Sequence, residues 1–333
     1  MKSQVFIVPL CEMCEGQEAD TFVLLSARQE GKTRDGKPFF RVTFRDARRE
    51  VTFPIWNDSA FADACRDQWK VGQYYKMRAV FTETKYGPQL DIRKIRLATP
   101  EDKADGFDEG LFQPRSKFDS EAMFAQLLGL AEREISDTAL SALASELLKE
   151  HREILLRLPA ARRNHHAYVG GLLEHVLSVT RNAIFLADKY AADYPELNPP
   201  LSRDLVIAGA ILHDIGKVFE LETTPSGAEY TPQGELIGHI LLGRDMVRAA
   251  AAAHKVKDET LLRLEHIIVS HQRLPEWGSP KPPMTPEAIL VHFADDVDAK
   301  FQTALCALAE PGEGSFTSPR NPLNYRIFRG LKE

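Results

Sequence analysis

The sequence contains no apolar run that approaches the roughly 20 residues needed to cross a bilayer. Its first residues, MKSQVFIVPLCEMCEG, become polar too early for a signal peptide. Only 4 of the 333 residues are cysteines, which argues against a disulfide framework and favours a reducing cytoplasm. Cys11 and Cys14 form a lone CxxC without a second pair, so we expect two ordinary thiols rather than a zinc or redox site.

Acidic residues are comparatively scarce in one part of the chain. Residues 26–98 contain 16 Lys and Arg against 9 Asp and Glu, an excess of +7, whereas the net charge of the whole chain is −6. The remaining residues therefore carry −13. This asymmetry suggests that the basic segment contacts a polyanion. A solvated basic face on a small β domain is the alternative.

The same basic segment has the sequence pattern of a small β-barrel. The pair Asp35-Gly36, within Arg34-Asp35-Gly36-Lys37, is a sequence signal for a hairpin turn. We predict a helix at 57–69 and strands at 21–25, 39–44, 49–56, 74–82 and 89–97. Five strands with a helix between the third and the fourth is the order of the OB-fold. We therefore predict an all-β OB-fold barrel over residues 1–98.

Barrels of this kind bind single strands through a basic groove with aromatic platforms. The candidate phosphate contacts are Lys37, Arg41, Arg45, Lys85 and Arg93. At strand spacing about half of the aromatic side chains must be core, and the pattern does not select which ones stack on bases. The available aromatic residues are Phe39, Phe40, Phe44, Phe53, Trp56, Tyr75 and Tyr86.

The second half of the sequence is helical, with hardly a strand signal. Residues 99–117 are acidic and punctuated by Gly and Pro, and we predict a linker there. An all-α bundle over 118–310 follows, with helices expected at 119–133, 136–156, 168–190, 202–213, 234–254, 258–271 and 286–309. The tail at 311–333 has aromatic anchors that would pack on the body or on another subunit, so we note a homo-oligomer as an expectation.

Metal-capable side chains recur at inward positions of these predicted helices. The apolar run 205–212 ends in His213-Asp214, and we expect Gly216 to stop the helix there. Imidazole and carboxylate side by side suit a divalent ion. A lone inward His is usually a hydrogen-bonded core residue, but five inward groups on five successive helices are much less accidental. The others are His175, His239, His271 and Asp295.

The order of these residues resembles the H…HD…D signature of the HD-domain metal-dependent phosphohydrolases. The segments HHAYVGGLLEH, ILHDIGK, GHILLG, SHQRLPEWGSP and HFADDVDAK behind an OB-type domain resemble the YhaM family of bacterial 3′→5′ exoribonucleases. The resemblance covers nearly the whole chain and implies that residues 118–310 form an HD domain.

The resemblance also implies roles for individual residues. His175, His213, Asp214 and Asp295 would hold a first metal ion, and Asp214 would bridge to a second ion held by His239 and His271. Gln272 departs from the His-His pair of relatives, which puts the filling of the second site in question. The expected ion is Mn²⁺, with Fe²⁺, Co²⁺ or Ni²⁺ as alternatives.

Four further residues have suggested roles near this centre. Lys217 would touch a phosphate oxygen, although a surface Lys is the alternative. His166 would face the phosphate or protonate the leaving group, with a structural loop His as its alternative. Asp298 would orient a ligand, and Trp277 would stack on a terminal base, although Trp277 could instead anchor its own loop.

The expected function is therefore metal-dependent 3′→5′ exonuclease activity on single-stranded RNA, or on DNA, releasing nucleoside 5′-monophosphates. One alternative is a phosphohydrolase for free nucleotides. The other is a nucleic-acid-binding regulator whose HD half is only structural.

Overall fold

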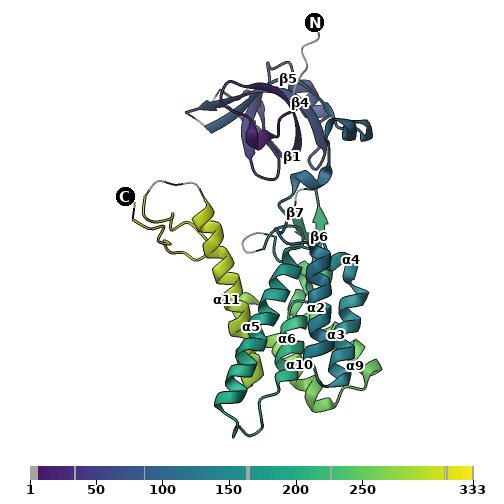
Figure 1. Ribbon diagram of the computed structural model, residues 1–333. Coiled ribbons are helices and arrows are strands. Elements are labelled where there is room, and N and C mark those ends of the chain that lie inside the picture. The colour runs from purple at the N-terminus through teal and green to yellow at the C-terminus, as the bar shows by residue number, and fades with distance from the viewer. Residues whose placement is uncertain are drawn as a thin grey trace. The chain divides into compact units, whose positions relative to one another are not determined.

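The computed structural model describes residues 7–33, 35–85, 87–162, 166–225, 227–310, 312 and 314–331 (Figure 1). Arg34, Tyr86 and His165 of the sequence patterns above lie outside these ranges. The chain divides into two units, Met1–Pro114 with Thr224–Gly227, and Arg115–Thr223 with Ala228–Glu333. No helix within the described ranges is long and apolar enough to span a membrane.

The first unit is a closed five-stranded antiparallel barrel. Its elements are η1 (Leu10–Glu12), β1 (Glu18–Lys32), β2 (Pro38–Arg45), β3 (Glu50–Trp56), α1 (Ala62–Asp67), β4 (Tyr74–Thr84) and β5 (Gly87–Leu97). The strand order is β3-β2-β1-β4-β5, and β3 also packs against β5, which closes the barrel. This order, with a helix between β3 and β4, is the OB-fold, so the predicted fold class is confirmed.

Alternation along the strands separates the barrel core from its outer face. On β2, Phe40, Val42 and Phe44 are buried, while Phe39 and Arg41 point the other way. The helix α1 is shorter than predicted. Its C-terminal end is tied to β1 by Arg28, whose guanidinium donates to the carbonyls of Cys65, Arg66 and Trp69.

Much of the segment predicted as a linker packs on the barrel instead. It forms η2 (Pro100–Asp105) and η3 (Glu109–Phe112). Phe107 buries its ring against Phe22 of β1, and Phe112 packs on Phe107 and on Tyr74 of β4. Asp102 is buried and accepts a two-pronged hydrogen bond from Arg96, at 2.7 Å for each contact. Burial of two aromatic rings therefore outweighs the acidic, Gly-punctuated pattern of this segment.

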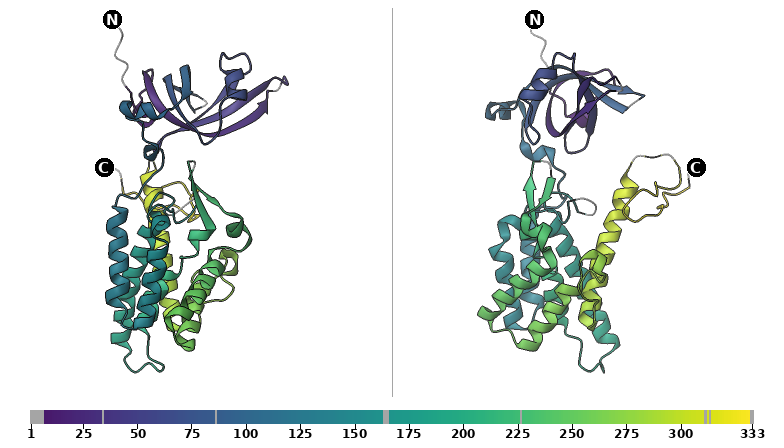
Figure 2. Two further views of the ribbon diagram at one scale, coloured as in Figure 1. Left: turned by 90° about the vertical axis from the view of Figure 1, so that its right-hand side faces the viewer. Right: turned by 180° about the vertical axis from the view of Figure 1, so that it is seen from behind.

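The second unit is a helical bundle (Figures 1 and 2). Its elements are α2 (Ser120–Glu134), α3 (Thr138–Glu150), α4 (Arg152–Leu155), α5 (Gly171–Asp193), α6 (Arg203–Leu212), α7 (Lys217–Glu220), β6 (Leu221–Thr224), β7 (Gly227–Tyr230), α8 (Pro232–Leu236), α9 (His239–His254), α10 (Asp258–Ser270), η4 (Pro275–Trp277) and α11 (Pro286–Ala309).

The central helix of this bundle is α6. All eight residues from Leu205 to Leu212 are buried, because α5, α10, α11, α2 and α3 surround the helix. Ser202 caps its N-terminus through the backbone N–H of Leu205. The apolar run predicted from the sequence thus delivers His213 and Asp214 to the centre of the bundle.

Two local features of the bundle differ from the prediction. The hairpin β6–β7 was not expected, and the helix predicted at 234–254 is broken into α8 and α9. Gly238 has φ 79°, a conformation that a helix interior does not allow. As a consequence His239 begins a new helix, α9, rather than lying in the middle of one.

Candidate metal centre

The six predicted ligand residues converge on one buried point. His175 comes from α5, His213 and Asp214 follow α6, and the others are His239 at the start of α9, His271 after α10 and Asp295 on α11. The His175 Nε2 lies 3.3 Å from His213 Nε2 and 3.2 Å from Asp295 Oδ1. Five separate segments therefore contribute to one cluster, which matches the expectation from the helical pattern.

Asp214 stands between two groups of imidazole nitrogens. Its Oδ2 lies 3.6 Å from His175 Nε2 and 3.5 Å from His213 Nε2. Its Oδ1 lies 3.4 Å from His239 Nε2 and 3.6 Å from His271 Nε2. The two carboxylate oxygens thus face two different sets of ligands, and each set with Asp214 has the spacing of a metal site.

Each of the four histidines points its Nε2 inward because its Nδ1 is held from outside. His213 Nδ1 donates to the carbonyl of Ala210, and His271 Nδ1 donates to the carbonyl of Ile268, each at 2.8 Å. The Nδ1 of His239 lies 2.8 Å from Glu220 Oε1, and that of His175 lies 2.7 Å from Asp298 Oδ2. Such outer partners fix the tautomer and the ring orientation of metal-ligating histidines.

Two buried atoms of this cluster face each other without forming a hydrogen bond, and both could bind a metal ion. Asp214 Oδ1 and His271 Nε2 have no hydrogen-bond partner among the described residues, although they lie 3.6 Å apart. Because His271 Nδ1 carries the proton given to Ile268, both facing atoms are lone-pair acceptors. Buried polar atoms are normally satisfied, and a cation between these two would satisfy both.

The electrostatics of the site also suit a cation. Burial lowers the pKa of His213 and lowers that of His271 to about 3, so both imidazoles are neutral, as metal ligation requires. Burial also acts to lower the pKa of His175, but its bonds to Asp295 and Asp298 outweigh burial and raise it to about 10. The carboxylates of Asp295 and Asp298 therefore stabilise a positive charge in the site.

Lys217 is buried beside Asp214 rather than exposed at the surface. Its Nζ lies 2.9 Å from Asp214 Oδ2 and donates to the carbonyl of Ala160 at 2.7 Å. Burial acts to raise the pKa of Asp214, but the ammonium of Lys217 and the neighbouring histidines hold that pKa well below its ordinary value. The surface alternative for Lys217 is thus wrong, and contact with a phosphate stays a prediction.

Gly216 serves close packing rather than helix termination. Its φ of −63° is ordinary helical backbone and α6 has already ended at Leu212, so Gly216 is not the residue that stops the helix. A Cβ built at this position would lie 2.0 Å from the carbonyl oxygen of His239. Glycine therefore lets the HD turn approach the first residue of α9, which brings His239 to Asp214.

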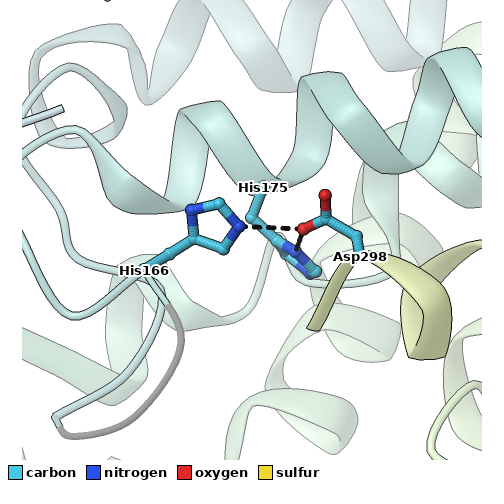
Figure 3. A group of neighbouring side chains, drawn as sticks. All are labelled: His166, His175 and Asp298. Atoms are coloured by element: carbon cyan, nitrogen blue, oxygen red, sulfur yellow. Dashed lines mark hydrogen bonds and ion pairs between the residues drawn. The ribbon is translucent and has the colours of Figure 1, made fainter. Parts of the chain in front are cut away.

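Asp298 joins His175 to His166 behind the metal ligands (Figure 3). Its Oδ2 lies 2.7 Å from His175 Nδ1 and 2.9 Å from His166 Nε2, and its Oδ1 accepts from the hydroxyl of Ser178. The expected orienting role of Asp298 agrees with this geometry. His166 is buried and its Nδ1 lies 2.9 Å from the hydroxyl of Tyr168. Its direct action on a leaving group stays a prediction.

The second half of the site contains the departure at Gln272. The Nε2 of its amide lies 3.3 Å from His239 Nε2, so this side chain borders the second set of candidate ligands. The backbone N–H of Gln272 donates to Ser279, which anchors the loop carrying Trp277. Trp277 is about half exposed in η4, as a stacking residue would need to be.

Sequence reasoning missed Glu220, which holds His239 from outside. The carboxylate accepts from the backbone N–H of His239 at 3.0 Å and lies 2.8 Å from its Nδ1. An acidic residue within the short buried helix α7 was the available signal, because a buried carboxylate needs a partner. The pairing with His239 depends on the break at Gly238, which the sequence pattern did not predict.

The predicted nucleic-acid contacts fall into two groups on the barrel. Arg41 and Arg45 lie on β2, opposite Pro54 and Glu50 of β3, and Lys37 immediately precedes β2. Lys85 and Arg93 belong to the β4–β5 hairpin, and Arg93 pairs with Asp91 at 2.9 Å. The five candidate cations are therefore divided between β2, with the residue just before it, and the β4–β5 hairpin.

The outer face of β2 and β3 also carries an aromatic pair. Phe39 lies opposite Trp56, with ring centroids 5.3 Å apart, and Trp56 is 49% exposed. Next to this pair is a hollow of about 350 Å³ lined by Glu30, Gly31, Lys32, Pro38, Phe39, Phe40, Asn57 and Arg66. Of the aromatic candidates, Phe40, Phe44, Phe53 and Tyr75 are core residues.

The fold and the site together define an OB-fold barrel followed by a helical domain with a buried His and Asp centre. A family model described as the HD domain matches residues 172–300, a span that includes all six predicted ligands. Residues 172–300 thus form an HD domain. HD domains bind divalent metals, so the match indicates a metal-dependent phosphohydrolase.

Two solved structures resemble the N-terminal unit. One is the second OB-fold domain of replication protein A from Methanococcus maripaludis, with 12% identity and a TM-score of 0.22. The other, a crystal structure of a domain of replication protein A from the same organism, has 9% identity and a TM-score of 0.23. Each match covers 28% of this chain and 94% of the other chain. The OB-fold assignment rests on the strand order described above.

Proposed function

We propose that this protein is a metal-dependent 3′→5′ exonuclease that shortens single-stranded RNA, with DNA as an alternative strand, and that it acts in the cytoplasm. The observation that carries the metal chemistry is the position of Asp214, whose two oxygens face two separate sets of inward imidazole nitrogens. The resemblance of the HD motifs and their preceding OB-fold to the YhaM family supports the choice of an RNA strand as substrate.

The proposed ligands divide between two ions. His175, His213, Asp214 and Asp295 would hold the first, and Asp214, His239 and His271 the second, which Gln272 leaves with a weak ligand. Mn²⁺ is the proposed ion, with Fe²⁺, Co²⁺ or Ni²⁺ as alternatives, because a mixed set of imidazoles and carboxylates suits divalent first-row metals. When bound, the ions supply charge neutralisation at the phosphate and lower the pKa of a water molecule.

The chain's own residues would then position and balance the reaction. Asp298 and Glu220 hold the rings of His175 and His239, and Lys217 offsets the charge of Asp214. Hydrolysis adds water across the terminal phosphodiester and breaks the bond between phosphorus and the 3′ oxygen. The 3′ oxygen takes a proton, and a nucleoside 5′-monophosphate leaves.

The OB domain, proposed as residues 1–98, would bind the strand on the face of β2 and β3. Phe39 and Trp56 offer ring surfaces for base stacking, and Arg41 lies two residues from Phe39 on the same face. A free nucleotide needs no such face, so this arrangement favours a strand over the mononucleotide alternative. Trp277 would stack on the terminal base near the HD centre.

The reaction can be tested with a 5′-labelled single-stranded RNA and Mn²⁺. We expect a ladder of labelled products that shortens from the 3′ end, together with nucleoside 5′-monophosphates. Asp214→Ala should abolish turnover while leaving RNA affinity unchanged. Intact RNA, internal cuts, or hydrolysis of mononucleotides alone would each contradict the proposal. Equal activity in Asp214→Ala would remove the metal assignment.

The binding face can be tested separately by fluorescence anisotropy. Stacking contributes about 1–3 kcal/mol per base, so Trp56→Ala should weaken RNA binding by roughly 5- to 150-fold. Leu97→Ala is a matched control, since Leu97 is 46% exposed on the same barrel. Leu97 lies on β5, opposite Tyr75 of β4, and is not among the residues that line the hollow beside Phe39. Equal losses in both variants would refute the role of this face.

A further inference from the structure

The exposed face of α11 is almost uncharged. All 24 residues of this helix are described, and Lys300 is its only exposed charged residue. The exposed large apolar side chains form one ridge, mostly at a spacing of four residues, that winds around the helix by about 40° per step. They are Ile289, Phe293, Val297, Phe301, Leu305 and Leu308, and we call this set the α11 stripe.

Such a face is unusual for a helix at the surface of a domain, whose outward side normally carries polar residues. Helix α2 of the same bundle shows the ordinary pattern, with Glu121, Gln126, Glu132 and Arg133 exposed. In Figures 1 and 2 the C-terminal part of α11 extends away from the other helices of its unit. The α11 stripe is therefore a distinct apolar surface over the length of the helix.

We propose that the α11 stripe docks against the α11 stripe of a second copy of this chain in a two-fold dimer. The stripe is nearly symmetric about Val297. Phe293 and Phe301 lie four residues to either side of it, and Ile289 and Leu305 lie eight residues to either side. In an antiparallel pair centred on Val297, each Phe293 meets Phe301 of the second copy, as a self-complementary two-fold interface requires.

Charge and area both suit this occupant. The one charged residue, Lys300, is paired with Asp296 of its own helix at 2.7 Å, so two copies meet without like-charge repulsion. The stripe exposes 37–65% of its six side chains. Taking about 200 Å² for a whole phenylalanine and somewhat less for the aliphatic residues, this is roughly 550 Å² per copy. Two copies would bury at most about 1,100 Å², just below the roughly 1,200 Å² at which the range of stable specific interfaces begins.

The dimer can be tested by measuring the mass of the full chain in solution, without reference to activity. Light scattering coupled to size exclusion should give twice 37.4 kDa for the wild type. The double variant Phe293→Glu, Phe301→Glu should give 37.4 kDa, with unchanged circular dichroism. Ile154→Glu on α4, a residue that is 40% exposed, is the matched control and should remain dimeric.

A cysteine at the proposed two-fold axis provides a second, positional test. In a background with Cys11, Cys14 and Cys306 replaced by Ser, Val297→Cys should form a disulfide-linked dimer on oxidation, because only a residue near the axis brings its Cβ close to that of its copy. Ile154→Cys should not. The proposal would be overturned by a wild type that stays monomeric over a 100-fold range of protein concentration. A dimer that survives the double Glu change, or the absence of a cross-link at Val297→Cys, would also overturn it.

Discussion

Replacing Asp298 with alanine removes the carboxylate that holds two histidines of the HD domain in place (Figure 3). Its Oδ2 lies 2.7 Å from His175 Nδ1 and 2.9 Å from His166 Nε2. Without it, the His175 ring loses a hydrogen bond that does two things in the wild type. That bond fixes the tautomer of the ring and keeps its Nε2 directed toward Asp214. Losing an outer partner of this kind typically costs 10- to 100-fold in metal affinity, which corresponds to about 1.4–2.8 kcal/mol.

The assay is titration of the metal-free protein with Mn²⁺, followed by calorimetry. We expect Asp298→Ala to raise the dissociation constant by 10- to 100-fold. The dissociation constant of Asp298→Asn should lie between those of Asp298→Ala and the wild type, because the amide oxygen can still accept from both histidines while the negative charge is lost. The pair thus separates the effect of geometry from that of charge.

Asp296→Ala is the matched control, since Asp296 lies on the same helix and pairs outward with Lys300. Its affinity for Mn²⁺ should equal that of the wild type. If Asp298→Ala binds Mn²⁺ as tightly as the wild type and retains its circular dichroism, then Asp298 does not position His175 and the reasoning fails.

Three further predictions concern stability. Gly216→Ala should destabilise the protein by about 1–3 kcal/mol in chemical denaturation, because its Cβ would lie 2.0 Å from the His239 carbonyl; Gly129→Ala, which meets only the flexible end of Arg133, should not, and equal losses would contradict the packing argument. Mn²⁺ at 100 times its dissociation constant should stabilise the wild type by about 2.7 kcal/mol and leave Asp214→Ala unaffected, whereas an equal shift in both would place the ion elsewhere. The bond from Arg96 and burial act in opposite directions on Asp102, and its pKa is lowered on balance. The contribution of the Asp102 carboxylate to the free energy of unfolding is therefore complete above the unfolded pKa of about 3.9 and is lost as the pH falls further. In chemical denaturation, Asp102→Asn should show its full loss of stability relative to the wild type at pH 7 and a smaller one below about pH 4; a loss that does not change with pH would refute this.

The barrel could be predicted because its strands are local patterns. Alternation in Phe39–Phe44 and Arg49–Trp56 and the turn at Asp35-Gly36 need only neighbouring residues to be read. The segment after residue 98 could not be predicted in the same way. Phe107 packs on Phe22 and Phe112 packs on Tyr74, both of which lie far away in the sequence, and no local pattern encodes these contacts.

The candidate site shows the same division. His175, His213, Asp214, His239, His271 and Asp295 could be selected because each is a metal-capable residue at an inward helical position. Their outer partners could not be selected. Glu220, for example, meets His239 only because the helix is interrupted at Gly238. The role of Gly216 was misassigned for a related reason, since glycine at a close approach and glycine at a helix end look alike in a sequence.

The sequence by itself determined that this protein joins a β-barrel to a helical domain, and that six His and Asp residues face the interior of that domain. Periodicity and motif spacing carry this information, because secondary structure fixes which side chains share a face. Only the tertiary structure decided that Asp214 presents one oxygen to each of two ligand sets, that Lys217 is buried against it, and that Asp298 links His175 to His166. These relations depend on how separate helices pack, and packing is set by contacts between residues that are distant in the chain.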